Sequence, residues 1–202
     1  MSDDASSSAV MHDDASSSAV IRDDATTDEA SSRGFSLIEL LVVVAVIAII
    51  AGIAIPALLQ AKMRANEAAA IGSLSAIRSA QSVFASTCAH GGFAQSLNDL
   101  ARPPAGATQS FISEPLGANG VLRSGYVANL TADVGAMVVT PAATTCNGSA
   151  ADAMSSYFAE RHPDRVSITG QRSFALATSG TIYYKDDGSL IAPGMAGATL
   201  IN

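Results

Sequence analysis

The hydrophobic residues of this chain gather in one stretch, GFSLIELLVVVAVIAIIAGIAIPALLQ, which covers residues 34–60. Residues 40–59 contain no charged side chain, and a helix of about 20 apolar residues spans the hydrocarbon core of a bilayer. A secretory signal peptide has a shorter apolar core, of about 7–15 residues, followed by a small-residue cleavage site, and no such site follows here. The pattern therefore predicts a retained transmembrane helix, with a buried core helix of a soluble protein as the alternative.

The residues after this stretch continue the helix with a different pattern. Good helix formers dominate residues 57–88. Apart from one step of seven residues, their apolar positions recur near every third or fourth residue: Met63, Ala70, Leu74, Ile77, Ala80 and Phe84. The polar positions of this half are assigned to the other helix faces: Lys62, Arg64, Glu67, Arg78 and Gln81. We also expect a weak pair between Glu67 and Arg64, three residues earlier.

These patterns predict one helix over residues 35–88. Its first half is apolar on all sides, and its second half is amphipathic and needs a partner surface. Pro56 removes the hydrogen bond to the carbonyl of Gly52. We therefore expect a kink or local melting at these two residues, tolerated in lipid only where protein neighbours satisfy the freed backbone.

Beyond residue 89 the pattern changes to loops and short strands. Strands are expected at residues 126–131 and 136–140, and a hairpin over 172–177 and 181–185. The amphipathic helix half offers the surface that these strands need to cover. The expected fold class is α+β, a long N-terminal helix packed against a small antiparallel sheet. The expected segments are 1–34 (leader), 35–59 (membrane half), 60–88 (amphipathic half) and 89–202 (β domain).

The leader is an acidic repeat of three ten-residue units, MSDDASSSAV, MHDDASSSAV and IRDDATTDEA. Six of the seven net negative charges of the chain lie in residues 1–34. Such composition has little to bury and predicts disorder, and an acidic interaction tail is the alternative. Because the repeat contains a second methionine, Met1 and Met11 are both candidate starts.

The remaining polar residues exclude several functions. No basic patch with interleaved aromatic residues predicts nucleic-acid binding. His12, His90 and His162 lack metal-ligand spacing, His162 is placed in a surface turn, and KDDG at residues 185–188 is interpreted as a hairpin turn, not a calcium loop. No nucleophile motif is present, so we expect no enzyme, catalytic residue, metal or cofactor. Cys88 and Cys146 are expected to form a disulfide if this part lies outside the cytoplasm.

Glu39 is the unusual residue of the apolar stretch. A carboxylate in lipid is costly unless it is paired, and no Lys, Arg or His lies near it in that stretch. If the chain were cut after Gly34, Phe35 would carry a new ammonium group four residues before Glu39. One cleavage would then explain both the distant start of the helix and its single charge.

These residues resemble a known family. The sequence RGFSLIELLVVVAVIAIIAGIAIPALL is similar to the class III signal of type IV pilins and of the pseudopilins of type II secretion, with Gly34, Phe35, Glu39 and Pro56 at the positions of the family motif. The leader departs from the family, whose leaders are usually short and basic. The resemblance implies that a membrane-embedded prepilin peptidase cuts between Gly34 and Phe35 and N-methylates Phe35.

The resemblance also implies a place and partners. The cut subunit would cross the bacterial inner membrane once, among membrane lipids, with its C-terminal domain outside the cytoplasm. An inner-membrane assembly platform would then move it into a cell-surface or periplasm-spanning filament of identical or related pilin subunits. Glu39 would pair there with the Phe35 amine of a neighbour. The expected function is a structural subunit of a type IV pilus or pilus-like filament. The alternatives are a type II secretion pseudopilin and a membrane-anchored monomeric periplasmic binding protein.

Overall fold

A computed structural model describes residues 34–201 of the chain, so the expectations for the acidic leader at 1–33 lie outside the described residues. The chain divides into two compact units, residues 1–43 and 44–202. In the described part of the first unit, residues 34–36 have no regular structure and helix α1 (Leu37–Thr87) begins. The first hydrogen bond of this helix runs from the Leu40 amide to the Ser36 carbonyl, 3.2 Å away.

Helix α1 confirms the predicted long helix to within two residues at each end. It is helical without interruption through Gly52 and Pro56. The local melting expected at this pair therefore does not occur, because only one helix hydrogen bond is lost at a proline and the flanking turns keep theirs. A kink at the same place stays a prediction.

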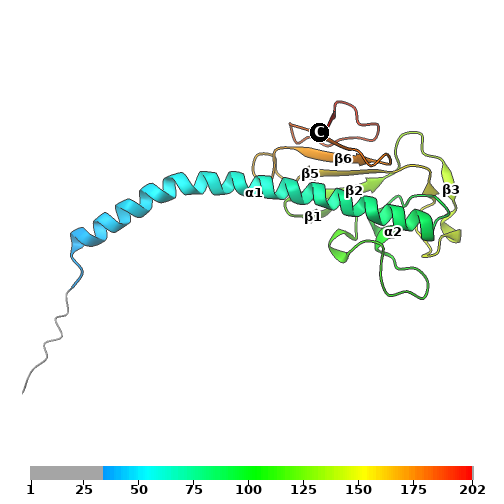
Figure 1. Ribbon diagram of the computed structural model, residues 1–202, viewed down its shortest axis with the longest axis horizontal. Coiled ribbons are helices and arrows are strands. Elements are labelled where there is room, and N and C mark those ends of the chain that lie inside the picture. Colours follow the sequence, from blue (N-terminus) through cyan, green and yellow to red (C-terminus); the bar gives the residue numbers. More distant parts are fainter. Residues whose placement is uncertain (1–33, 202) are drawn as a thin grey trace, which may run out of the picture. The chain divides into compact units, whose positions relative to one another are not determined.

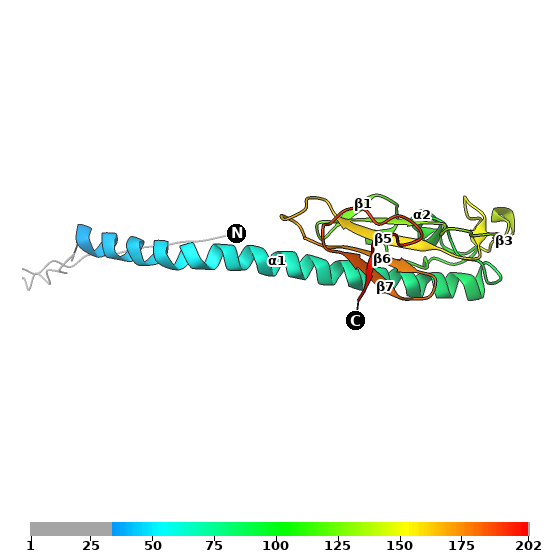
Figure 2. The ribbon, with the colours of Figure 1, turned by 90° about the horizontal axis from the view of Figure 1, so that it is seen from above.

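The second unit contains a six-stranded sheet in the order β1-β2-β5-β6-β7-β8, and every pairing in it is antiparallel. Its strands are β1 (Val121–Arg123), β2 (Tyr126–Thr131), β5 (Phe158–Pro163), β6 (Ser173–Ala177), β7 (Ile182–Lys185) and β8 (Thr199–Leu200). Strands β3 (Val138–Thr140) and β4 (Ala153–Met154) form a separate pair. The later part of α1 lies along the large sheet in both views (Figure 1 and Figure 2).

Three short helices lie in the connections: α2 (Leu97–Ala101), η1 (Glu114–Leu116) and η2 (Ala142–Thr144). Helix α2 is capped by Ser96, whose hydroxyl accepts a hydrogen bond from the Asp99 amide. Its side chains Leu97 and Leu100 are fully buried beside the end of α1, so this connection adds to the core.

The core lies between the amphipathic half of α1 and one face of the large sheet. From the helix it takes the predicted residues Ala70, Leu74, Ile77, Ala80 and Phe84, and from the sheet Tyr126, Ala128, Leu130, Phe174 and Leu176. Met63, predicted for the same helix face, is half-buried. A smaller cluster, separate from this core, contains Phe158 of β5, Ala175 of β6 and Ile191 of the C-terminal segment. The α+β fold expected from the sequence is confirmed.

Several local expectations were wrong. Glu67 and Gln81 are buried against the domain and do not lie on a solvent-facing side of α1. Glu67 pairs with Arg172 and not with Arg64. His162 and Pro163 belong to strand β5 and not to a surface turn, because they pair with Val127 and Tyr126 of β2.

Candidate functional site

The first half of α1 is an exposed apolar surface. Every residue from 34 to 62 is exposed except the half-buried Ala51. Phe35, just before the helix, is 78% exposed. Within residues 34–201, α1 is the one helix long and apolar enough to span a membrane, judged by length and composition. A surface of this size is not stable in water and requires lipid or other protein around it.

Glu39 lies in the first turn of this surface. None of the ion pairs among the described residues includes it. The helix dipole favours a carboxylate in a first turn by about 0.3–1 kcal/mol, which helps the helix to start but supplies no counter-ion. Among residues 34–201 the Glu39 carboxylate therefore has no ionic partner.

Gly34 has no structural role in the chain itself. A β-carbon added to it would meet no atom within 4 Å, and its backbone does not adopt a positive φ. Nothing in this fold therefore demands glycine here. A molecule that must approach the backbone closely would demand it, as the predicted cleavage between Gly34 and Phe35 requires.

The buried half of α1 is attached to the sheet by a carboxylate clamp. Glu67 accepts hydrogen bonds from the amides of Gln171 and Arg172, at 3.0 and 3.2 Å, and from Nε and Nη2 of Arg172, at 3.0 and 2.7 Å. The Arg172 guanidinium also lies over the rings of Phe174 and Tyr184, 5.5 and 5.7 Å from their centres. Burial alone would raise the pKa of Glu67, but these hydrogen bonds and the arginine charge outweigh it and lower that pKa.

Two further attachments lie toward the C-terminal end of α1. The Gln81 side-chain amide forms two hydrogen bonds with the backbone of Ala94. Its Nε2 donates to the Ala94 carbonyl at 2.7 Å, and its Oε1 accepts from the Ala94 amide at 2.9 Å. The predicted disulfide between Cys88 and Cys146 is present and ties the end of α1 to the segment after η2. Glu67 and Gln81 were missed from sequence because their partners lie outside the helix, whereas periodicity reports only the helix itself.

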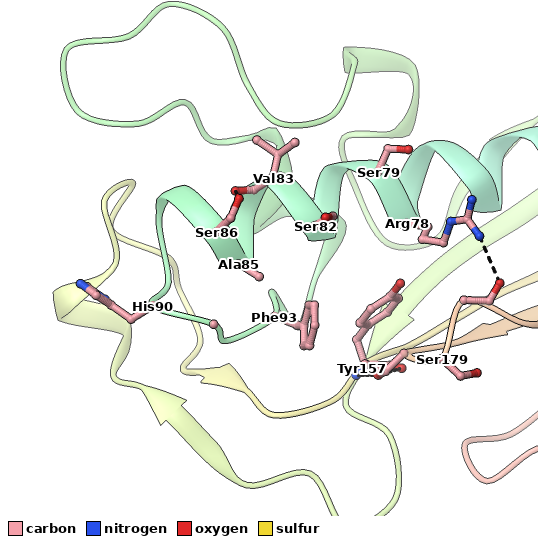
Figure 3. Close-up of a pocket in the computed structure, with 13 residues that line it drawn as sticks. Arg78, Ser79, Ser82, Val83, Ala85, Ser86, His90, Phe93, Tyr157 and Ser179 are labelled. Atoms are coloured by element: carbon pink, nitrogen blue, oxygen red, sulfur yellow. Dashed lines mark hydrogen bonds between the residues drawn. The ribbon is translucent and has the colours of Figure 1, made fainter.

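Figure 3 shows a groove beside the C-terminal part of α1. The helix contributes Arg78 and three serines, Phe93 and Tyr157 lie opposite, and the turn between β6 and β7 closes one end in a cavity of about 910 Å³. Nη1 of Arg78 donates to the Gly180 carbonyl at 3.3 Å, the interaction drawn there. Burial raises the pKa of Tyr157 to about 12, so this phenol stays protonated at neutral pH. None of the residues predicted as cleavage or assembly sites lines this groove.

The histidines and acidic residues that the structure describes form no metal cluster of three or more ligands. Nδ1 of His162 lies 3.0 Å from the Glu160 carboxylate, and this hydrogen bond raises the pKa of His162 despite partial burial. Asp187 accepts hydrogen bonds from the amide and hydroxyl of Ser189, as in a tight turn.

Comparisons with known proteins bear on the N-terminal part. Residues 30–55 match the family model described as the prokaryotic N-terminal methylation motif. The chain carries a type IV pilin-like class III signal. This signal includes Gly34, Phe35 and Glu39, and it ends before the buried half of α1 begins.

A curated relative supports the same assignment. The major component of the wide type IV pilus of Thermus thermophilus is 57% identical over 37 residues. The match covers 18% of this chain and 28% of that protein, so the likeness spans less than a third of the relative's length. No solved structure matches the chain.

Proposed function

We propose that this protein is a structural subunit of a type IV pilus or a pilus-like filament. The observation that carries the proposal is the coincidence of three features in one segment. The class III signal covers residues 30–55, the helix in that segment is exposed and apolar, and its one carboxylate, Glu39, has no partner among the described residues. A simple membrane anchor requires the second feature and neither of the others.

Processing is the first step of the proposal. A prepilin peptidase cuts between Gly34 and Phe35 and methylates the new Phe35 amine, removing the acidic leader. The unobstructed, exposed surroundings of Gly34 support this cut, because the bond is accessible and the glycine has no competing role in the fold.

Assembly is the second step. The cut subunit crosses the inner membrane once through the first half of α1, with the disulfide-containing unit outside the cytoplasm, where oxidised cysteines persist. An assembly platform moves it into a filament whose centre is made of these helices. Glu39 of one subunit then meets the Phe35 ammonium of another. A subunit in the wrong register leaves both charges unpaired in an apolar surrounding, which is a strong penalty.

One observation favours a pilus over a type II secretion pseudofilament: the curated relative is a component of a type IV pilus. The pseudopilin alternative shares the signal and the helix, and differs in whether fibres leave the cell surface.

The experiment is mechanical shearing of cells that produce the protein, followed by mass spectrometry and electron microscopy of the released material. We expect fibres that contain a chain starting at a methylated Phe35. A chain that keeps residues 1–34 in a host with an active prepilin peptidase, or a processed chain that never leaves the membrane fraction, would contradict the proposal. Processed protein in short periplasmic assemblies without surface fibres would assign it to secretion.

A further inference from the structure

A second pocket lies directly after the exposed apolar part of α1. It has a volume of about 730 Å³. Its lining comes from about two turns of the helix and two loops at the same end of the sheet: Gln60, Met63, Arg64, Glu67, Gln171, Arg172 and Asp186. The helix half of this lining begins at the residue that follows Leu59, the last residue of the uncharged stretch.

The position of this pocket relative to a bilayer follows from the geometry of α1. At a rise of about 1.5 Å per residue, Gln60 and Arg64 lie about 1.5 and 7.5 Å beyond Leu59 along the axis. The polar layer on each side of the hydrocarbon core is about 5–7.5 Å thick. When the apolar stretch occupies a bilayer, as the proposed function requires before assembly, these two side chains therefore lie at the level of the lipid headgroups.

The pocket contains four charged side chains, of which two form an ion pair with each other and two do not. Glu67 and Arg172 satisfy each other through the clamp described above. Arg64 and Asp186 are both exposed, and neither side chain joins an ion pair with any other described residue. One free cation and one free anion thus face the same cavity, with the half-buried Met63 as its apolar contact.

We propose that this pocket binds the headgroup of a zwitterionic phospholipid that carries a primary ammonium. Arg64 takes the phosphate, to which a guanidinium donates two parallel hydrogen bonds. The Asp186 carboxylate takes the ammonium. The inference rests on the membrane-inserted state within the proposed function and adds a lipid specificity to it. Such a site would hold the sheet at a fixed height above the bilayer before assembly.

Lipid selectivity tests this proposal. The full chain, purified in detergent, is titrated with phosphatidylethanolamine, phosphatidylcholine or phosphatidylglycerol, and bound lipid is counted by native mass spectrometry. Phosphatidylcholine keeps both charges but its methylated ammonium cannot donate a hydrogen bond, and phosphatidylglycerol lacks the ammonium. We expect phosphatidylethanolamine to bind about tenfold more tightly than either, the effect of one charge-assisted hydrogen bond.

Variants separate the pocket from general attraction to the membrane. R64Q and D186N should each reduce phosphatidylethanolamine binding about tenfold. The matched control is K62Q, which removes a cation from the same helical turn outside the pocket and should leave binding unchanged. Near-ultraviolet circular dichroism of each variant checks the fold.

Equal binding of the three lipids, or equal loss in R64Q and K62Q, would overturn the proposal. A competition experiment with soluble phosphoethanolamine tells a lipid site from a site for the free headgroup. Competition by it at the same concentration as the lipid would mean a site for free phosphate esters and would overturn the lipid assignment. If lipid selectivity is absent but processing and fibres are normal, the proposed filament function stands and the lipid site is wrong. If lipid selectivity and fibres are both absent, the interpretation of the membrane segment itself is wrong.

Discussion

Glu67 is a direct test of how the long helix is held to the sheet. Changing it to glutamine keeps its size and leaves one oxygen to accept from the amides of Gln171 and Arg172. The other oxygen becomes an NH₂ group that faces the Arg172 guanidinium, so donor meets donor. The substitution therefore removes the two charge-assisted hydrogen bonds to that side chain while changing little else.

The expected cost lies between two limits. Breaking a fully buried ion pair costs about 3–5 kcal/mol, and an exposed pair contributes about 0–1 kcal/mol. The Glu67 side chain is only 9% exposed, but that of Arg172 is 40% exposed, so water can solvate the arginine again. Its contacts with Phe174 and Tyr184 also remain. We expect a loss of about 2 kcal/mol, which lowers the urea midpoint by about 1 M.

The acid dependence of stability gives an independent check. The pKa of Glu67 is lowered from its ordinary value of 4.5 in the folded chain. Its contribution is therefore fully present above pH 4.5 and is lost as pH falls through the folded pKa. The original protein should lose stability on acidification below 4.5, and Glu67→Gln should lose less, because the glutamine does not titrate.

The assay is urea unfolding of the full chain in detergent, followed by the near-ultraviolet dichroism of its tyrosines. The matched control is Glu114→Gln, the same chemical change at an exposed carboxylate outside the clamp, which should change the free energy of unfolding by no more than about 0.5 kcal/mol. A midpoint and acid dependence for Glu67→Gln that equal those of the control would refute the clamp.

Three other predictions concern the signal and the disulfide. Gly34→Leu should leave the folded unit unchanged, because its surroundings are open, yet block the cut, so that mass spectrometry finds the full leader; a chain starting at Phe35 would contradict this. Glu39→Ala should be inserted and cut normally, since losing a charge eases insertion, but release few or no fibres on shearing; a normal fibre yield would remove the assembly role. Replacing Cys88 and Cys146 by serine opens a loop with a separation of 58 residues and should cost about 4 kcal/mol, whereas an unchanged urea midpoint would show that the bond does not stabilise the fold.

Much of the fold could be predicted from local periodicity. Strand β2 was predicted from the sequence at its observed bounds, Tyr126–Thr131, and its burial in the structure alternates as in a strand with one face on the core. The hairpin of β6 and β7 was found because a glycine turn separates two short apolar runs. The first half of α1 was predicted from an uncharged apolar stretch long enough to span a bilayer, and the second half from apolar positions that repeat with the period of a helix.

Strand β5 shows why the rest could not be predicted. Its sequence FAERHP has charged residues in the middle and a proline at the end, features typical of a turn. In the sheet, Glu160 accepts a hydrogen bond from Nδ2 of Asn129 at 2.6 Å, and Nη2 of Arg161 donates to the carbonyls of Arg123 and Tyr126. These partners come from β1 and β2, far away in sequence. They satisfy the polar side chains of β5, so residues with a low preference for strands form a central strand here.

The candidate site shows the same division. Gly34, Phe35 and Glu39 could be assigned to the class III signal from the sequence, because the spacing of that motif is local and fixed. Glu67 was assigned to the wrong face because its partner, Arg172, lies 105 residues later, and no property of the helix sequence reports a partner at that distance.

In the filament that we propose, the exposed half of α1 gives a physical reason why a single carboxylate would decide assembly. Lipid tails are as apolar as leucine, so a helix that moves from the bilayer into a filament of like helices gains little from the hydrophobic effect. Between residues 34 and 62 the described side chains are almost entirely free of the protein's own sheet, so no intramolecular contact must be broken either. With both large contributions nearly cancelled, packing and the one available charge pair determine the direction of the move. Glu39 is the only charged side chain between residues 34 and 61, so in the proposed assembly it would supply a selectivity that the aliphatic residues around it cannot.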